Sequence, residues 1–136
     1  MIDSSLYQYL DTLLNSGSGP QWSIQEGKID FTKTAPWVWF RRSSTIQERL
    51  LDGTPLDNFT SQFDVEIVST DIDEVQATTD FIKAGLQSIV YLVMGETKVF
   101  SVSVEDHQDD YVSRTVLDTD EGLHIAALFI TFLHRG

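Results

Sequence analysis

The sequence predicts a single α+β domain, residues 1–136, in which helices pack on a mostly antiparallel sheet. Two segments, near residues 1–16 and 72–88, carry apolar residues at the three- and four-residue spacing of an amphipathic helix. Most other apolar segments either alternate apolar with polar residues or are rich in β-branched and aromatic residues, as strands are. The strand segments come in runs separated by single helices, so the predicted order is α-β-β-β-α-β-β-β, which is typical of an antiparallel sheet.

The N-terminal part is predicted to be a helix followed by a flexible connection. The helix, residues 1–16, has its apolar residues at helical spacing, and Asp3, Ser4 and Ser5 offer possible N-caps. Two glycines and a proline in residues 15–20 end it. The connection covers residues 17–35, and residues 21–35 read as a loop with room for one short strand.

The body of the domain, residues 36–136, is predicted to begin with a pair of strands and a turn. Residues 36–42 are rich in β-favouring residues and start with proline, where a missing donor does least harm. Residues 46–51 are expected to pair back on this strand. A turn is predicted at residues 52–55, which read Asp-Gly-Thr-Pro.

The clearest strand and the clearest helix follow each other. Residues 59–67 alternate, with apolar residues and one serine on one face and polar residues on the other, which predicts a half-buried strand. Residues 72–88 repeat apolar residues at steps of three and four. Asp71 or Thr70 can cap that helix, and its single apolar stripe is expected to lie on the sheet.

The C-terminal part is predicted to supply three more strands. Residues 98–105 alternate again, and residues 111–117 are a further strand candidate. Residues 123–134 are apolar on both faces. Such a strand is either covered on both sides or lies at a subunit contact.

Composition excludes several kinds of chemistry. The chain has no cysteine, which rules out disulfides, thiolate metal sites and thiol nucleophiles. Its formal net charge of −12 repels phosphate, so tight nucleic-acid binding is not expected. The first residues lack the basic and apolar regions of a signal peptide, and no apolar run has the length of a membrane-spanning helix.

The succession of elements resembles the phage tail-completion family, also called tail terminator or head–tail joining proteins. The stretches that carry the resemblance, taken in order, are an N-terminal helix leading to Ser18-Gly19-Pro20, residues 36–42, the turn region 50–56, the strand 61–67, the acidic-capped helix 70–86, Asp109-Asp110-Tyr111 and a closing strand of the 123–134 type. The resemblance covers nearly the whole chain and lies in order and spacing. One departure is the segment 88–95, which is more apolar than the linker expected there.

The resemblance implies a structural role in virion assembly. Proteins of this family form a ring, commonly of six subunits, that caps the tail tube and joins it to the head through a head-completion protein. DNA then passes through the centre without tight binding, and an acidic channel would not hold phosphate. The implied location is the bacterial cytoplasm during assembly and then the virion. No enzyme activity, cofactor or membrane partner is expected.

Four residues of the segment 36–42 are candidate interface residues: Trp37, Trp39, Arg41 and Arg42. The spacing places Trp37, Trp39 and Arg41 on one strand face and Arg42 on the other. Aromatic residues usually serve core packing, but tryptophan and arginine are also enriched at protein interfaces. In a ring, this basic end is expected to meet an acidic patch of the neighbouring subunit.

The acidic segment from Asp106 to Asp110 is the candidate for that patch or for the channel wall. Asp106, Asp109 and Asp110, with His107 between them, are also the one cluster in the sequence with metal-ligand chemistry. They lack the residue order of an EF-hand, and a solvated acidic loop is the simpler interpretation. No metal site is therefore predicted.

Two other functions remain open at this point. One is a small cytoplasmic ligand-binding or adaptor module, which would need a deep apolar pocket between the helix 72–88 and the sheet. The other is a metal-dependent hydrolase using the 106–110 cluster. The sequence has no nucleophile-elbow motif and no phosphate-binding loop. His124 and His134 lie on one strand face but about 33 Å apart, too far to share a metal.

Overall fold

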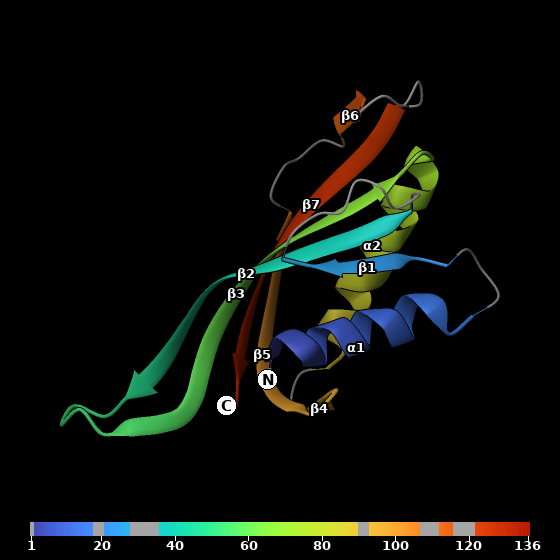
Figure 1. Cartoon of the computed structure of the whole chain (residues 1–136). Coiled ribbons are helices and arrows are strands. Elements are labelled where there is room, and N and C mark those ends of the chain that lie inside the picture. The colour runs from blue at the N-terminus through green and yellow to red at the C-terminus, as the bar shows by residue number, and fades with distance from the viewer. Residues whose placement is uncertain (1, 18–20, 28–35, 90–92, 107–111, 116–121) are drawn as a thin grey trace.

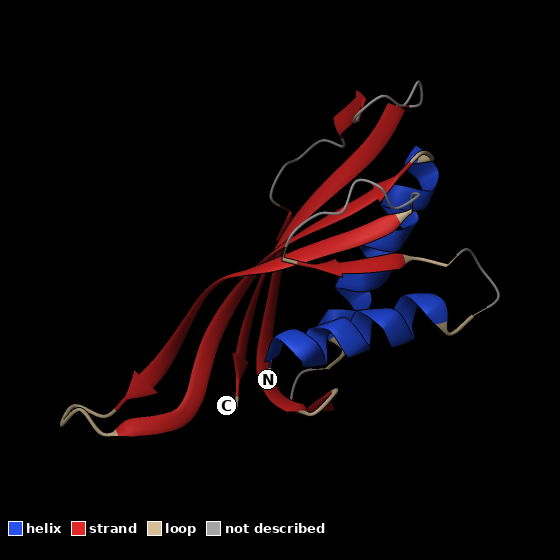
Figure 2. Cartoon of the chain, in the orientation of Figure 1, coloured by secondary structure: helices blue, strands red, loops and turns tan. Residues whose placement is uncertain are grey.

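The computed structural model of the chain describes residues 2–17, 21–27, 36–89, 93–106, 112–115 and 122–136. Two helices pack on one side of a single curved sheet (Figures 1 and 2). The elements, in chain order, are α1 (Ile2–Asn15), β1 (Ser23–Glu26), β2 (Trp37–Arg49), β3 (Pro55–Ser69), α2 (Ile72–Gln87), β4 (Val93–Met94), β5 (Thr97–Asp106), β6 (Val112–Thr115) and β7 (Gly122–His134). No described helix has the length and apolar character needed to cross a bilayer.

The predicted α+β class is confirmed, with a mostly antiparallel sheet and both helices packed on it. The strands lie in the order β1-β2-β3-β7-β5-β4, and β6 pairs with the first residues of β7. β1 pairs with β2 in parallel, and the other pairings are antiparallel. The predicted element order agrees apart from the additional two-residue β4.

One detail of the predicted N-terminal half is wrong. Residues 46–51 do not pair back on residues 36–42, because β2 runs continuously from Trp37 to Arg49 and pairs along its length with β3. Irregularities in the pairing lie between Arg42 and Ser44 and between Gln47 and Arg49, but the strand does not turn there, since that stretch lacks glycine and proline. The third strand before α2 is instead β1, the one short strand for which the predicted loop 21–35 left room.

The chain reverses at the predicted turn between β2 and β3. Gly53 has a φ of 89°, a value that favours glycine. The Asp52 carboxylate accepts a hydrogen bond of 2.9 Å from the Thr54 amide. The predicted helix 72–88 is also confirmed as α2, with Asp71 as its N-cap accepting from the Asp73 amide at 3.0 Å.

The core lies between the two helices and the inward face of the sheet. From α2, the stripe Val75, Thr79, Ile82 and Leu86 is buried against β3, β5 and β7. Three phenylalanines stack edge to face across the strands: ring centroids lie 6.0 Å apart for Phe40 and Phe63, and 5.8 Å apart for Phe63 and Phe132.

The hairpin of β2 and β3 extends past this core. The pairing of β3 with β7 ends at Phe59 and His134, beyond which β3 is paired only with β2. We call residues 46–58 the arm; it projects away from both helices (Figure 1, lower left). Every residue of the arm is exposed or only partly buried.

The phenylalanine cluster should dominate the stability of the fold. Phe63 is fully buried between two other rings, so Phe63→Ala should lower the free energy of unfolding by about 3–5 kcal/mol. Phe81→Ala is the matched control, because Phe81 is 52% exposed on α2, and we expect a change within about 0.5 kcal/mol. Equal losses for both variants in denaturant titrations would contradict this placement of the core.

Candidate functional site

The structure separates the four candidate interface residues onto two faces of the sheet. Trp37, Trp39 and Arg41 lie on the face opposite the helices, which we call the open face, and Arg42 lies on the helix face. Trp37 is only 4% exposed and packs with Val68 and Ile125. Its side chain therefore packs within the domain and is not exposed for contact with a partner.

Trp39 and Arg41 form a half-exposed pair on the open face. The Trp39 indole donates a hydrogen bond of 2.7 Å to the Gly27 carbonyl, which ties β2 to the end of β1. The Arg41 guanidinium lies 5.7 Å from the centre of the Trp39 ring, within cation–π range. It also pairs with the Asp64 carboxylate at 3.7 Å, while its own side chain stays 60% exposed.

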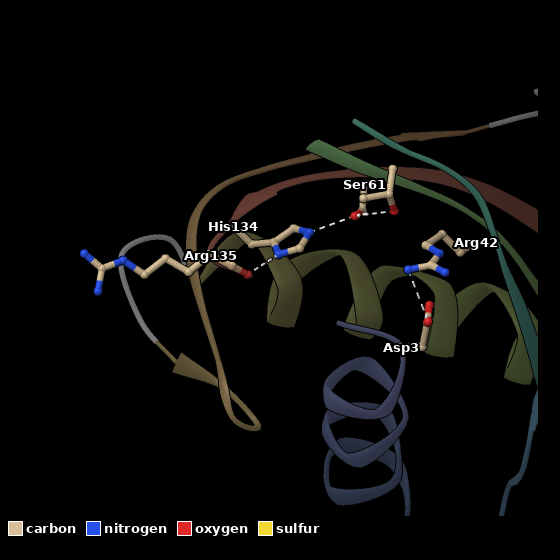
Figure 3. A network of polar contacts seen from close by, with 6 residues as sticks. Asp3, Arg42, Ser61, His134 and Arg135 are labelled. Carbon is tan, nitrogen blue, oxygen red and sulfur yellow. Dashed lines mark hydrogen bonds and ion pairs between the residues drawn. The ribbon is translucent and has the colours of Figure 1, made fainter. Parts of the chain in front are cut away.

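Arg42 lies at the root of the arm, where β2 leaves the body of the domain. Its guanidinium lies 3.4 Å from the Asp3 carboxylate at the start of α1 (Figure 3). The irregularity after Arg42 falls at the same place, just before β2 enters the arm. Arg41 and Arg42 thus have different partners within the chain, and they lie on opposite faces as the strand spacing predicts.

The predicted acidic cluster falls mostly outside the described residues. Asp106 ends β5, and Asp109 and Asp110 lie in the segment between β5 and β6, of which nothing is described. Within the described residues, no group of three or more His, Asp or Glu side chains could hold a metal ion.

The open face carries a shallow pocket beside the Trp39–Arg41 pair. Its volume is about 190 Å³, and Trp39, Arg41, Asp64, Glu66 and Ala127 contribute to its lining. These residues belong to three neighbouring strands, because Trp39 pairs with Glu66 in the register of β2 and β3, and Glu66 pairs with Ala127 in that of β3 and β7. The pocket therefore has an aromatic and aliphatic surface with one cation and two carboxylates.

A second group of polar residues lies at the root of the arm, on the helix face (Figure 3). The Ser61 hydroxyl lies 2.7 Å from Nε2 of His134, and Nδ1 of His134 lies 2.6 Å from the carbonyl of Arg135. A carbonyl can only accept, so Nδ1 carries the proton and Ser61 donates to Nε2. The Thr45 hydroxyl, 3.0 Å from Ser61, completes the chain as donor.

This serine–histidine pair has the hydrogen bond of an activated nucleophile, but its surroundings suit a structural role. Nucleophilic attack requires that a substrate reach the hydroxyl oxygen. Ser61 is fully buried and His134 is 3% exposed. A backbone carbonyl, rather than a carboxylate, orients the ring, and the Phe59 ring stacks on it with centroids 5.8 Å apart. The pair fixes β3 to β7 where the arm leaves the body.

Sequence reasoning missed this pair because its members are far apart in the chain. The alternation in residues 59–67 places Ser61 on the inward face, and the even spacing in β7 gives the face of His134. Only the register of β3 against β7 brings them together, and these strands are far apart in the chain, so no short turn between them sets that register.

The burial of His134 should make stability depend on pH. Burial lowers the pKa of His134 below its ordinary value of 6.5; the hydrogen bond to Arg135 opposes this effect, the charge of Arg42 adds to it, and the charge of Asp3 opposes it. The unfolded chain therefore takes up a proton at a pH where the folded chain resists it. The contribution is fully present above about pH 6.5 and is lost as the pH falls toward the folded-state pKa.

We expect the free energy of unfolding to fall between pH 7 and pH 5, by at most about 1.4 kcal/mol per pH unit for this one proton. His134→Gln should remove this part of the slope while leaving the part that comes from the carboxyl groups. Denaturant titrations of parent and variant at matched pH values measure the difference. Parallel slopes for the two proteins would contradict the assignment.

With these two sites described, comparison with known proteins adds no relative: no protein-family model matches the chain, and no curated protein matches it.

Proposed function

We propose that this chain is a non-enzymatic assembly subunit of the phage tail-terminator or head–tail joining class, which forms a ring at the end of the tail tube. The observation that carries the proposal is the arm. It projects from the body, and its apolar side chains have no core to pack on. A partner that covers them is the simplest source of that burial.

The arm exposes three large aliphatic side chains within six residues, one at its root and two at its tip. Ile46 is 65% exposed, Leu50 is 50% exposed, and Leu51 is fully exposed. Burying one such side chain completely stabilises an assembly by about 1.5–3 kcal/mol. Scattered exposed apolar residues are common, but two adjacent leucines at the end of a projecting hairpin favour a contact surface.

The root of the arm supports this interpretation because it holds the arm in one direction. A two-stranded hairpin on its own is only marginally stable. Here the Arg42–Asp3 ion pair and the Ser61–His134 hydrogen bond fix both strands to the body just before the arm begins. An arm that is already oriented loses less conformational entropy when it binds.

The charge of the chain fits passage of DNA through such a ring. A net charge of −12 per copy repels a duplex, so a channel built from these copies would not retain it. The same charge makes copies repel each other at low salt, which favours assembly at higher ionic strength or on a template.

The alternative, a small ligand-binding or adaptor module, has less support. The inward stripe of α2 is packed into the core against the sheet. The open-face pocket, at about 190 Å³, is smaller than the roughly 300–1,000 Å³ typical of small-molecule sites.

The proposal predicts that purified protein added to bare tail tubes caps their ends. Electron microscopy should show a ring on each tube, and the double variant Leu50→Asp, Leu51→Asp should lose it. Both leucines are at least half exposed, so the free energy of unfolding should change by no more than about 0.5 kcal/mol per site.

Val93→Asp is the matched control, because Val93 is 59% exposed on β4, outside the arm. It should cap tubes as the parent does. If the parent protein left tube ends bare at every salt concentration tested, that result would contradict the proposed function.

A further inference from the structure

We infer that the arm of one copy docks on the open face of a second copy, with Leu51 seated in the pocket beside Trp39. This inference rests on the proposed function, because it names the partner surface for the arm. Both halves of the contact are present in the chain: a projecting apolar side chain and a hollow that fits it.

The turn at the tip presents Leu51 to solvent in a fixed geometry. The Leu50 amide donates to the Thr54 carbonyl at 2.8 Å, and the Gly53 amide donates to the Leu50 carbonyl at 2.9 Å. The Arg49 guanidinium donates to the Gly53 carbonyl at 3.1 Å. These bonds close the turn on itself, so Leu51 is left pointing away from the chain.

The pocket has room for one aliphatic side chain. Cavities of about 150 Å³ admit a benzene ring, and the open-face pocket measures about 190 Å³. Trp39 and Ala127 supply apolar surface for contact with leucine, while Arg41 and Glu66 lie at the same pocket. One leucine would remove both its own surface and theirs from water.

Each surface carries charges of both signs, which permits two opposite-charge pairs between them. Arg49 precedes Leu51 by two residues and Asp52 follows it, and the pocket offers Glu66 and the 60% exposed Arg41 side chain, which also pairs with Asp64 at 3.7 Å. Arg49 can therefore meet Glu66 while Asp52 meets Arg41. Pairs of this kind contribute mainly to specificity and to the rate of association.

The outer face of α2 is the rival surface, and its charge disfavours it. Phe81 is 52% exposed and Ile72 is 38% exposed there. Asp73, Glu74 and Asp80 surround them on the helix, and these would repel the carboxylates of the tip. α2 also carries one cation, Lys83, so its four charged side chains sum to −2, whereas Arg41, Asp64 and Glu66 at the pocket sum to −1.

The leucine cannot reach the pocket of its own copy. Arg41 at the pocket and Arg49 at the tip lie on the same strand, eight residues apart, or about 26 Å at 3.3 Å per residue. The contact must therefore join two copies. Because tip and pocket are different surfaces, the contact can repeat head-to-tail from copy to copy, and such a repeat generates a closed ring or an open filament.

The absence of native cysteine allows a direct test by disulfide cross-linking. Leu51→Cys protein is mixed with an equal amount of Ala127→Cys protein at high concentration and oxidised briefly. Docking raises the effective concentration of the two thiols, so the mixed disulfide should form about tenfold faster than that of the control pair, Leu51→Cys with Phe81→Cys. The thiol at position 81 in the control pair is more exposed to solvent than the thiol at position 127. Exposure alone would therefore favour the control pair and work against the inference.

A second set of variants tests the proposed charge pairs between the tip and the pocket. Arg49→Glu in the tip protein or Glu66→Arg in the pocket protein should each slow the Leu51–Ala127 cross-link, and the two changes together should restore it. Equal rates for the pocket and control pairs, or a faster control pair, would overturn the inference.

The same variants distinguish this inference from the proposed function. Rings on tail tubes without a preferred tip-to-pocket cross-link would leave the function standing and remove the docking surface. A preferred cross-link from protein that never caps tubes would establish the contact between copies and remove the tail-terminator function. Failure of both assays would overturn both.

Discussion

The hairpin of β2 and β3 is longer than the core against which it packs, and the other features of the structure depend on this difference in length. The pairing of β3 with β7 ends at Phe59 and His134. β2 and β3 continue past that point with no third strand beside them. Their apolar residues, above all Leu51, therefore stay in water in the isolated chain. The free energy available from covering them is the physical basis for the proposal that this chain is an assembly subunit.

The second consequence of one-sided packing is the open face. Strand β7 is apolar on both faces, but only the residues that face α1 and α2 enter the main core. On the other face, Trp37, Val68 and Ile125 form a small separate cluster, and the surface toward Ala127 stays partly exposed. The ion pair of Arg41 with Asp64 adds charged groups to that surface, and such groups are compatible with exposure to solvent. A sheet with one packed face and one half-polar face is suited to stacking against another molecule.

Much of the fold follows from local patterns, and the rest depends on contacts that such patterns do not contain. Period and capping predicted α2 and its Asp71 cap, and alternation predicted β3, because both signals reside in neighbouring residues. The continuity of β2 was missed, since apolar alternation weakens in the exposed arm, where no core requires it. The pairing of Ser61 with His134 depends on strand register, and the open-face pocket depends on three strands at once. The same-face placement of Trp37, Trp39 and Arg41 was predictable, whereas their separate partners were not.

Hydrogen–deuterium exchange along the arm tests the central claim most directly. Residues 46–58 should exchange rapidly in the free chain, because a two-stranded hairpin without a core opens easily. Once the protein is bound at tail-tube ends, the same amides should become strongly protected, while those of α2 change little. Arm amides that are already protected in the free chain, or that remain unprotected after assembly, would contradict the claim that the arm gains its core from a partner.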